Sequence, residues 1–113
     1  MKLDVARQGD VTVLAVSGEL NADSVGRFRK AVAEAMGRQQ RDFLVDLGSV
    51  TTIDSAGLEG LTALQRQCEE ELGMVRVCRA NPTLRKVFEL TRLDRQLTLC
   101  ETTEEALASF GQT

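Results

Sequence analysis

The sequence predicts an α/β fold with a mixed β-sheet, its elements following in the order ββαβαβαβα. Short apolar runs typical of strands alternate with segments whose apolar residues recur every three or four positions, as in amphipathic helices. The first two runs are separated by only three residues, which favours an antiparallel hairpin. Each later pair of strands is separated by a predicted helix, which requires a right-handed parallel crossover.

The length and composition indicate one domain, residues 1–113, with an aliphatic core. The chain has 113 residues, 42% hydrophobic and 27% charged, with 4% aromatic residues and neither Trp nor Tyr. A net charge of -3 and the few aromatic rings argue against a nucleic-acid partner. No apolar run approaches the roughly 20 residues of a membrane helix. We therefore expect a cytoplasmic protein that does not insert into membranes.

The residue types also restrict the chemistry. There is no histidine, which excludes a Ser-His-Asp triad and any His-ligated metal site. Cys68, Cys78 and Cys100 lie in apolar segments at irregular spacing, so we expect reduced core thiols. No glycine-rich phosphate loop is present. These absences predict a protein without a cofactor that is not an enzyme.

The N-terminal third is predicted to form the hairpin and one helix. Residues 2–7 and 11–16 form the strands, and the more polar first strand is placed at the sheet edge. Residues 17–22 form a loop, after which Asp23 or Ser24 caps the helix. Gly37 is placed in the stop position after this helix. The apolar stripe of the helix consists of Val25, Phe28, Ala31, Val32, Ala35 and Met36.

A central strand over Arg41–Leu47 is apolar enough to be buried on both faces. Residues 48–53 are expected to form a loop that leads into a second helix, residues 55–72, which Gly73 ends. The acidic run 69–71 near its end is interpreted as a solvated face, with a functional acidic patch as the alternative. The apolar positions of this helix are Leu58, Leu61, Leu64, Cys68 and Leu72.

The remaining chain is predicted to contain two more strands and two more helices. Residues 74–78 form a strand, and Asn81-Pro82 is a strong helix start. A loop over 92–95 precedes a last strand at 96–100, and Thr102 with Glu105 fits a capping box. The tail 111–113 should fray. The inner faces of the two helices are formed by Leu84, Val87 and Phe88, with Thr91 as a further candidate, and by Ala106, Leu107 and Phe110.

The candidate functional site is Asp54-Ser55, where the second helix begins. In α/β sheets, ligands and partners meet the loops at the carboxyl ends of strands. Ser55 has two compatible interpretations: a capping or first-turn hydroxyl, and a hydroxyl that is phosphorylated. Gly57 and Gly60 also have two interpretations. Each glycine costs about 1 kcal/mol relative to alanine in a helix interior, so its presence needs a reason. Either a partner approaches the backbone there, or the helix packs closely against its neighbours.

Two motifs carry a family resemblance. Val45-Asp46-Leu47 followed by Ile53-Asp54-Ser55-Ala56-Gly57-Leu58 resembles the signature of STAS domains, and more narrowly of bacterial anti-anti-sigma factors (anti-sigma factor antagonists). Gly18-Glu19-Leu20 matches the loop before their first helix, and the segment from Val77 to Leu93 matches their downstream pattern. The resemblance implies a small mixed sheet with helices packed mainly on one face.

The resemblance also implies a function. In the family, the serine after the aspartate, here Ser55, is phosphorylated by a serine kinase that is also the anti-sigma factor. The unphosphorylated protein binds that kinase, phosphorylation releases it, and a serine phosphatase resets the cycle. Ala56 stands where a second acceptor is often found, and Asn21 where many relatives carry Asp. The implied partner-binding residues are Glu19, Asn21, Asp54, Ser55, Ala56, Gly57, Leu58 and Glu59. The alternative is a non-switched subunit of a lipid-transport ABC or other signalling assembly.

Overall fold

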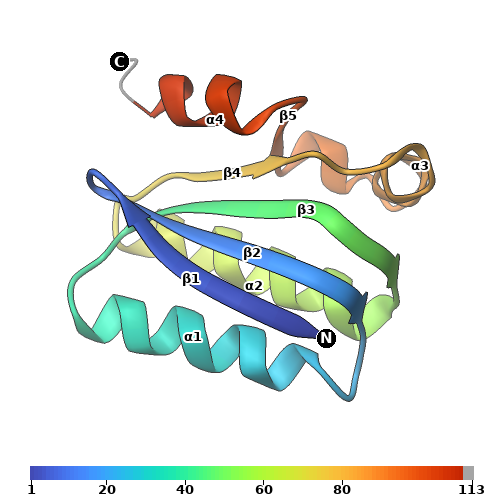
Figure 1. The fold of residues 1–113 in the computed structure, drawn as a ribbon, viewed down its shortest axis with the longest axis horizontal. Helices are drawn as coiled ribbons and strands as arrows, with labels where there is room; N and C mark the ends of the chain where they lie inside the picture. Colours follow the sequence, from blue (N-terminus) through green and yellow to red (C-terminus); the bar gives the residue numbers. More distant parts are fainter. Residues whose placement is uncertain (111–113) are drawn as a thin grey trace.

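In a computed structural model that describes residues 1–110, five strands form one sheet and four α-helices pack against it (Figure 1). The strands are β1 (Lys2–Gln8), β2 (Val11–Leu20), β3 (Asp42–Ile53), β4 (Val75–Cys78) and β5 (Thr98–Cys100). The helices are α1 (Val25–Gly37), α2 (Ser55–Glu70), α3 (Pro82–Leu90) and α4 (Thr103–Ser109), and a 3-10 turn, η1 (Leu93–Arg95), precedes β5. The predicted element order is confirmed, while the predicted fraying of 111–113 lies outside the described residues.

The sheet is mixed, as predicted, with the strand order β1-β2-β3-β4-β5. β1 pairs antiparallel with β2 and forms one edge, whereas β2, β3, β4 and β5 pair in parallel. The parallel strands therefore end on the same side of the molecule, so the segments that follow β2, β3 and β4 are neighbours in space. This arrangement brings the candidate site together.

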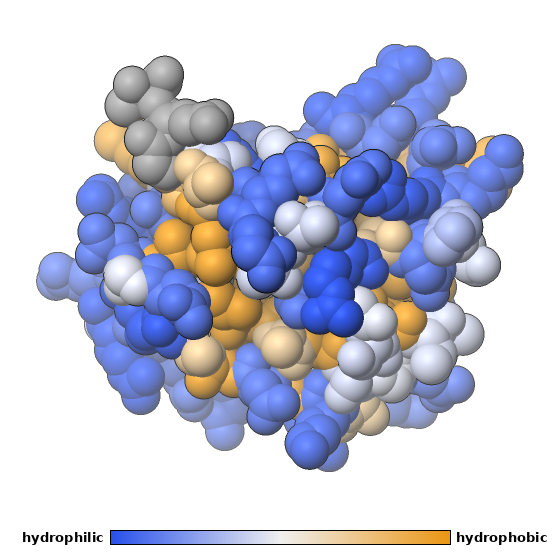
Figure 2. Space-filling view, turned by 45° about the horizontal axis from the view of Figure 1, so that its top comes forward, coloured by the Kyte–Doolittle hydropathy of each residue, from blue (hydrophilic) through white to orange (hydrophobic). Residues whose placement is uncertain are grey.

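The helices lie mainly on one face of the sheet, as predicted. Residues of α1, α2 and α3 share one large apolar cluster with the inward side chains of β2, β3 and β4. Only α4, among the described helices, packs on the other face, over a small cluster that includes Leu44, Cys78 and Cys100. Viewed obliquely from the α4 side, apolar residues form a central area with hydrophilic residues around it (Figure 2). β3 is thus buried on both faces, because Leu44 points away from Phe43 and Val45.

Two strands are longer than the sequence suggests. We expected residues 17–22 and 48–53 to be loops, but β2 continues to Leu20 and β3 to Ile53. Their parallel pairing persists past two register shifts, from Ala15 opposite Asp46 to Leu20 opposite Ile53. The polar residues of these segments point to solvent while their backbones pair, and bulges of this kind are common near functional sites.

The helix ends also differ from the prediction. Gly37 is the last residue of α1 rather than the residue after it, and the left-handed position belongs to Gln39, with φ 66°. α2 stops at Glu70 instead of residue 72, with Leu72 in the left-handed conformation, φ 60°. In both cases the next amide, that of Gln40 or Gly73, bonds a carbonyl five residues back, which closes a Schellman motif.

The smaller deviations are confined to the edges of elements. β4 begins at Val75 rather than residue 74. The expected loop contains η1, and the last strand is only Thr98–Cys100 because the amides of Gln96 and Leu97 bond back to the Leu93 carbonyl. Thr91 is exposed and follows α3 instead of facing the core. The three cysteines are free and buried, as predicted. Within residues 1–110, no helix combines the length and the apolar character needed to cross a membrane.

Candidate functional site

The candidate site lies where β3 passes into α2, at the carboxyl end of the parallel strands (Figure 1). Asp54 is extended, with φ -108° and ψ -174°, and is the N-cap of α2. Its Oδ1 accepts the Gly57 N–H at 3.0 Å. Ser55 is therefore the first helical residue rather than the cap, and its side chain is exposed. Of the two interpretations of Ser55, the structure assigns capping to Asp54 and leaves the Ser55 hydroxyl accessible.

The second carboxylate oxygen of Asp54 reaches a different segment of the chain. Its Oδ2 accepts the Ala22 N–H at 3.2 Å, and the Asp54 amide donates to the Leu20 carbonyl at 3.3 Å. The N–H of Gly57 is the main cause of a lowered pKa at Asp54, and the N–H of Ala22 adds to it, since both stabilise the ionised form. The carboxylate is therefore charged at neutral pH and joins the start of α2 to the loop after β2.

That loop is organised by Asn21. Of the two predicted caps, Ser24 occupies the N-cap position of α1, but its side chain makes no capping hydrogen bond. The side-chain Oδ1 of Asn21 accepts the N–H groups of Asp23 at 3.0 Å and Ser24 at 3.2 Å. The main-chain carbonyl of Asn21 accepts the N–H of Val25 at 2.8 Å. The Ser24 hydroxyl instead donates to the Glu19 carbonyl at 2.8 Å. Asn21 thus performs the capping function in front of α1, which fixes the loop internally.

Gly57 and Gly60 are explained by close packing inside the molecule. Both are buried. A Cβ on Gly57 would overlap the Leu20 carbonyl oxygen and lie 2.8 Å from Ile53 Cγ1. A Cβ on Gly60 would lie 2.6 Å from Val25 Cγ2. The absence of side chains therefore lets α2 lie directly against the end of β2 and the start of α1. This outcome was one of the two alternatives left open by the sequence.

The structure brings the predicted partner-binding residues to one surface. Glu19 and Asn21 come from the end of β2 and its loop, and the Asn21 amide lies 3.4 Å from a Glu19 carboxylate oxygen. Asp54 connects them to the first turns of α2. Glu19, Asp54, Ser55 and Glu59 are exposed, Asn21, Ala56 and Leu58 are half-buried, and Gly57 is buried. Gly57 contributes to this surface by packing, because its position leaves no room for direct contact.

Sequence reasoning missed Ala22 and the connecting role of Ser24. Ala22 acts through its backbone N–H, which no side-chain pattern reveals. Ser24 was assigned to capping because of its residue type, yet it bonds backward to the end of β2. The four residues between β2 and α1, which include Asn21 and Ser24, do signal a tight polar turn. The partners of these side chains depend on the tertiary structure.

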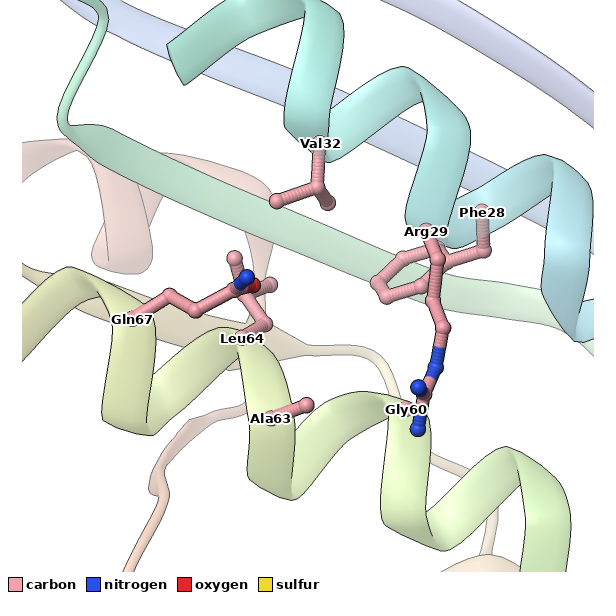
Figure 3. Close-up of a pocket in the computed structure, with 7 residues that line it drawn as sticks. All are labelled: Phe28, Arg29, Val32, Gly60, Ala63, Leu64 and Gln67. Carbon is pink, nitrogen blue, oxygen red and sulfur yellow. The ribbon is translucent and has the colours of Figure 1, made fainter.

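A second feature is a small hollow between α1 and α2 (Figure 3). The Phe28 ring and Leu64 form its floor, while the longer side chains of Arg29 and Gln67 stand at its sides. The residues that line it include neither a nucleophile nor a carboxylate. Across residues 1–110, no cluster of three or more Cys, Asp or Glu side chains is arranged to bind a metal ion. The remaining lining residues are Val32, Gly60 and Ala63.

Comparison with known proteins identifies the family. The family model described as "Mlab, STAS domain" matches residues 3–101. The anti-sigma-F factor antagonist RsfB of Mycobacterium tuberculosis is 27% identical over 103 residues, 91% of this chain and 84% of RsfB. The crystal structure of an anti-sigma factor antagonist from Mycobacterium paratuberculosis is 27% identical with a TM-score of 0.87, over 96% and 92% of the two chains.

A third protein, the Bacillus cell fate determinant SpoIIAA, has been solved in its phosphorylated form. It is 22% identical with a TM-score of 0.76, over 96% of this chain and 98% of that one, which shows a shared fold. The family model covers most of the chain and the described relatives align over nearly its whole length. The chain therefore belongs to the STAS domain family, and it is similar to anti-sigma factor antagonists within it.

Proposed function

We propose that this protein is an anti-sigma factor antagonist that binds a serine kinase/anti-sigma factor while Ser55 is unphosphorylated. The observation that carries the proposal is the position of Ser55. It is exposed at the first position of α2, and Asp54 rather than Ser55 caps the helix. Its hydroxyl can accept a phosphoryl group without loss of the cap. The relatives named as anti-sigma factor antagonists support the class of partner.

The geometry supplies a physical reason for a switch. A phosphate on Ser55 adds about -1.5 to -2 charges near neutral pH. It would stand beside the ionised Asp54, one turn before the exposed Glu59. The free N–H groups of the α2 N-terminus offset part of that charge, so the fold is retained. A partner docked on this surface, by contrast, meets a bulky anion at its centre.

The proposed binding surface consists of the end of β2, its loop and the first turns of α2. Leu58 is half-buried and provides an apolar contact, with the polar Glu19, Asn21 and Glu59 around it. Ala56 carries no hydroxyl, so Ser55 is the acceptor in this motif. A serine phosphatase restores the binding form. We place this cycle in the cytoplasm, without nucleic acid, cofactor or membrane insertion.

The test compares Ser55→Ala, Ser55→Asp and a control that adds the same charge elsewhere, Ser49→Asp, at an exposed residue of β3. Binding to the kinase that copurifies with the wild-type protein is measured by calorimetry. We expect Ser55→Ala and Ser49→Asp to bind as wild type does, and Ser55→Asp to bind at least about tenfold more weakly, a change of ~1.4 kcal/mol. Equal affinity of Ser55→Ala and Ser55→Asp would contradict the switch and favour the non-switched subunit of a lipid-transport ABC or other signalling assembly.

A further inference from the structure

The two carboxylate oxygens of Asp54 serve different segments of the chain. Oδ1 accepts the Gly57 N–H at 3.0 Å inside α2, and Oδ2 accepts the Ala22 N–H at 3.2 Å in the loop between β2 and α1. The bond to Ala22 joins residues that are 32 positions apart in the sequence. Among the other described caps, Thr102 accepts only an amide of its own helix, whereas Asn81 caps through Oδ1 and also donates its Nδ2 to the Val50 carbonyl at 3.4 Å. Asp54 is thus a cap and also a tertiary connection.

The loop that Asp54 holds carries part of the proposed binding surface. Asn21 and Ser24 fix the loop to itself and to the end of β2 through short hydrogen bonds. Its position relative to α2 depends on Asp54, through the carboxylate bond to Ala22 and the amide bond to Leu20. Ala22 is exposed, so water can replace the carboxylate as the acceptor of its N–H. This bond is the weak connection between the two halves of the surface.

We propose that Asp54 is a positioning residue that transmits the phosphorylation state of Ser55 to the β2–α1 loop by giving up its bond to Ala22. The inference rests on the proposed function of Ser55 and specifies how that site is regulated. Ser55 follows Asp54 directly, so its phosphate would bring a second anion beside the carboxylate, whose Oδ1 keeps the Gly57 N–H as the cap of α2. The two anions also repel each other. The carboxylate then leaves Ala22, and the loop with Asn21 loses its bond to the start of α2, while Glu19 stays paired in β2 opposite Thr52.

The substitution Asp54→Asn separates the two bonds. Asparagine is as good a helix cap as aspartate, so its single oxygen keeps the Gly57 bond. The amide nitrogen then faces the Ala22 N–H, and two donors cannot bond each other. Asp54→Ser provides a second variant with a capping oxygen that is too short to reach the loop. Thr102→Ala is the matched control, because it removes the cap of α4, whose Oγ accepts only the Glu105 N–H among the described bonds.

The experiment measures the solvent-exchange rate of the Ala22 amide proton by NMR in the full-length, ¹⁵N-labelled protein. Phosphoserine is placed at position 55 by co-translational incorporation, in the wild-type and in the Asp54→Asn background. We expect phosphorylation to raise the Ala22 exchange rate about tenfold, and Asp54→Asn to raise it by a similar factor. In the Asp54→Asn background, phosphorylation should add less than about twofold, since the connection is already lost. Thr102→Ala should leave the rate unchanged.

Two results would overturn the proposal. One is an Ala22 exchange rate that phosphorylation leaves unchanged in the wild-type background. The other is that phosphorylation raises the Ala22 exchange rate by the same factor in the wild type and in a variant without the Asp54 carboxylate, either Asp54→Asn or Asp54→Ser. The readout needs no partner, so it fails or succeeds independently of kinase binding. A protein that binds no kinase but shows the expected exchange rates would refute the proposed function and leave this connection intact.

Discussion

Gly57→Ala is a demanding test of how α2 lies against the end of β2. The added Cβ would overlap the carbonyl oxygen of Leu20 and approach Ile53 Cγ1 to 2.8 Å and the Leu20 carbonyl carbon to 3.1 Å. Two of these three contacts are backbone atoms of β2, which is paired with β3 up to this residue. A rotamer change cannot relieve the overlap, so α2 and the strand must separate.

The magnitude follows from two opposing terms. Alanine is favoured over glycine in a helix interior by at most about 1 kcal/mol. Forcing an extra carbon into a packed region costs about 1–3 kcal/mol, and a rigid backbone on both sides places this site at the upper end. The net expectation is a loss of ~2 kcal/mol in the free energy of unfolding. For a domain of this size, that corresponds to a fall in Tm of about 8 °C.

The assay is urea unfolding followed by circular dichroism, with thermal unfolding as a second measurement. Gly26→Ala is the matched control, because Gly26 lies in α1, lacks a positive φ and has no atom within 4 Å of its added Cβ. This control should gain about 0.5–1 kcal/mol. If Gly57→Ala were as stable as the wild type, the close packing of α2 on Leu20 would be wrong.

Three further predictions follow from other parts of the structure. Arg76→Ala should lower the free energy of unfolding by about 1–2 kcal/mol, measured by urea unfolding. The guanidinium lies 5.4 Å from the Phe110 ring centroid and donates a hydrogen bond to Ser109, the last residue of α4. An unchanged midpoint would show that Arg76 does not hold α4 against the sheet. The pKa of Asp54 is lowered in the folded state. The ionised carboxylate therefore contributes its full stabilisation of the fold above the unfolded pKa of about 3.9, and this contribution is lost as the pH falls through the folded pKa. The stability difference between wild type and Asp54→Asn should therefore shrink as the pH falls below about 5 and through the folded pKa, and a constant difference would contradict the cause given for the lowered pKa. Burial raises the pKa of Cys68 to about 12 and of Cys78 to about 11, so neither thiol should react with a disulfide reagent until urea unfolds the protein; rapid labelling of either would refute their burial.

Much of the fold could be predicted because apolar periodicity reports directly on burial. The stripe of α1 corresponds to side chains of the main core, and the continuous apolar run of β3 corresponds to both clusters, with Leu44 on the α4 side. The strand ends at Leu20 and Ile53 could not be predicted in the same way. Their polar neighbours, such as Glu19, point to solvent, and the strands persist through backbone pairing across register shifts. Pairing between distant segments leaves little trace in either segment alone.

The location of the site was predictable, but its internal connections were not. A polar Asp-Ser pair between an apolar strand and an amphipathic helix indicates a helix start at a sheet edge. The sequence does not indicate which of the two caps the helix, and the extended backbone of Asp54 decides it. The bond from Asp54 to the Ala22 N–H joins segments 32 residues apart through a backbone group. The role of Gly57 was likewise ambiguous until the Leu20 carbonyl was seen beside it.

The central claim is that the charge on Ser55 controls partner binding. The most direct measurement is affinity capture from a lysate of the source organism with three baits in parallel: wild type, Ser55→Asp and the charge control Ser49→Asp. Mass spectrometry identifies the bound proteins and determines whether Ser55 of the endogenous protein is phosphorylated. We expect a serine kinase that is retained by the wild type and Ser49→Asp and lost from Ser55→Asp. A membrane ATPase subunit held equally by all three baits would contradict it.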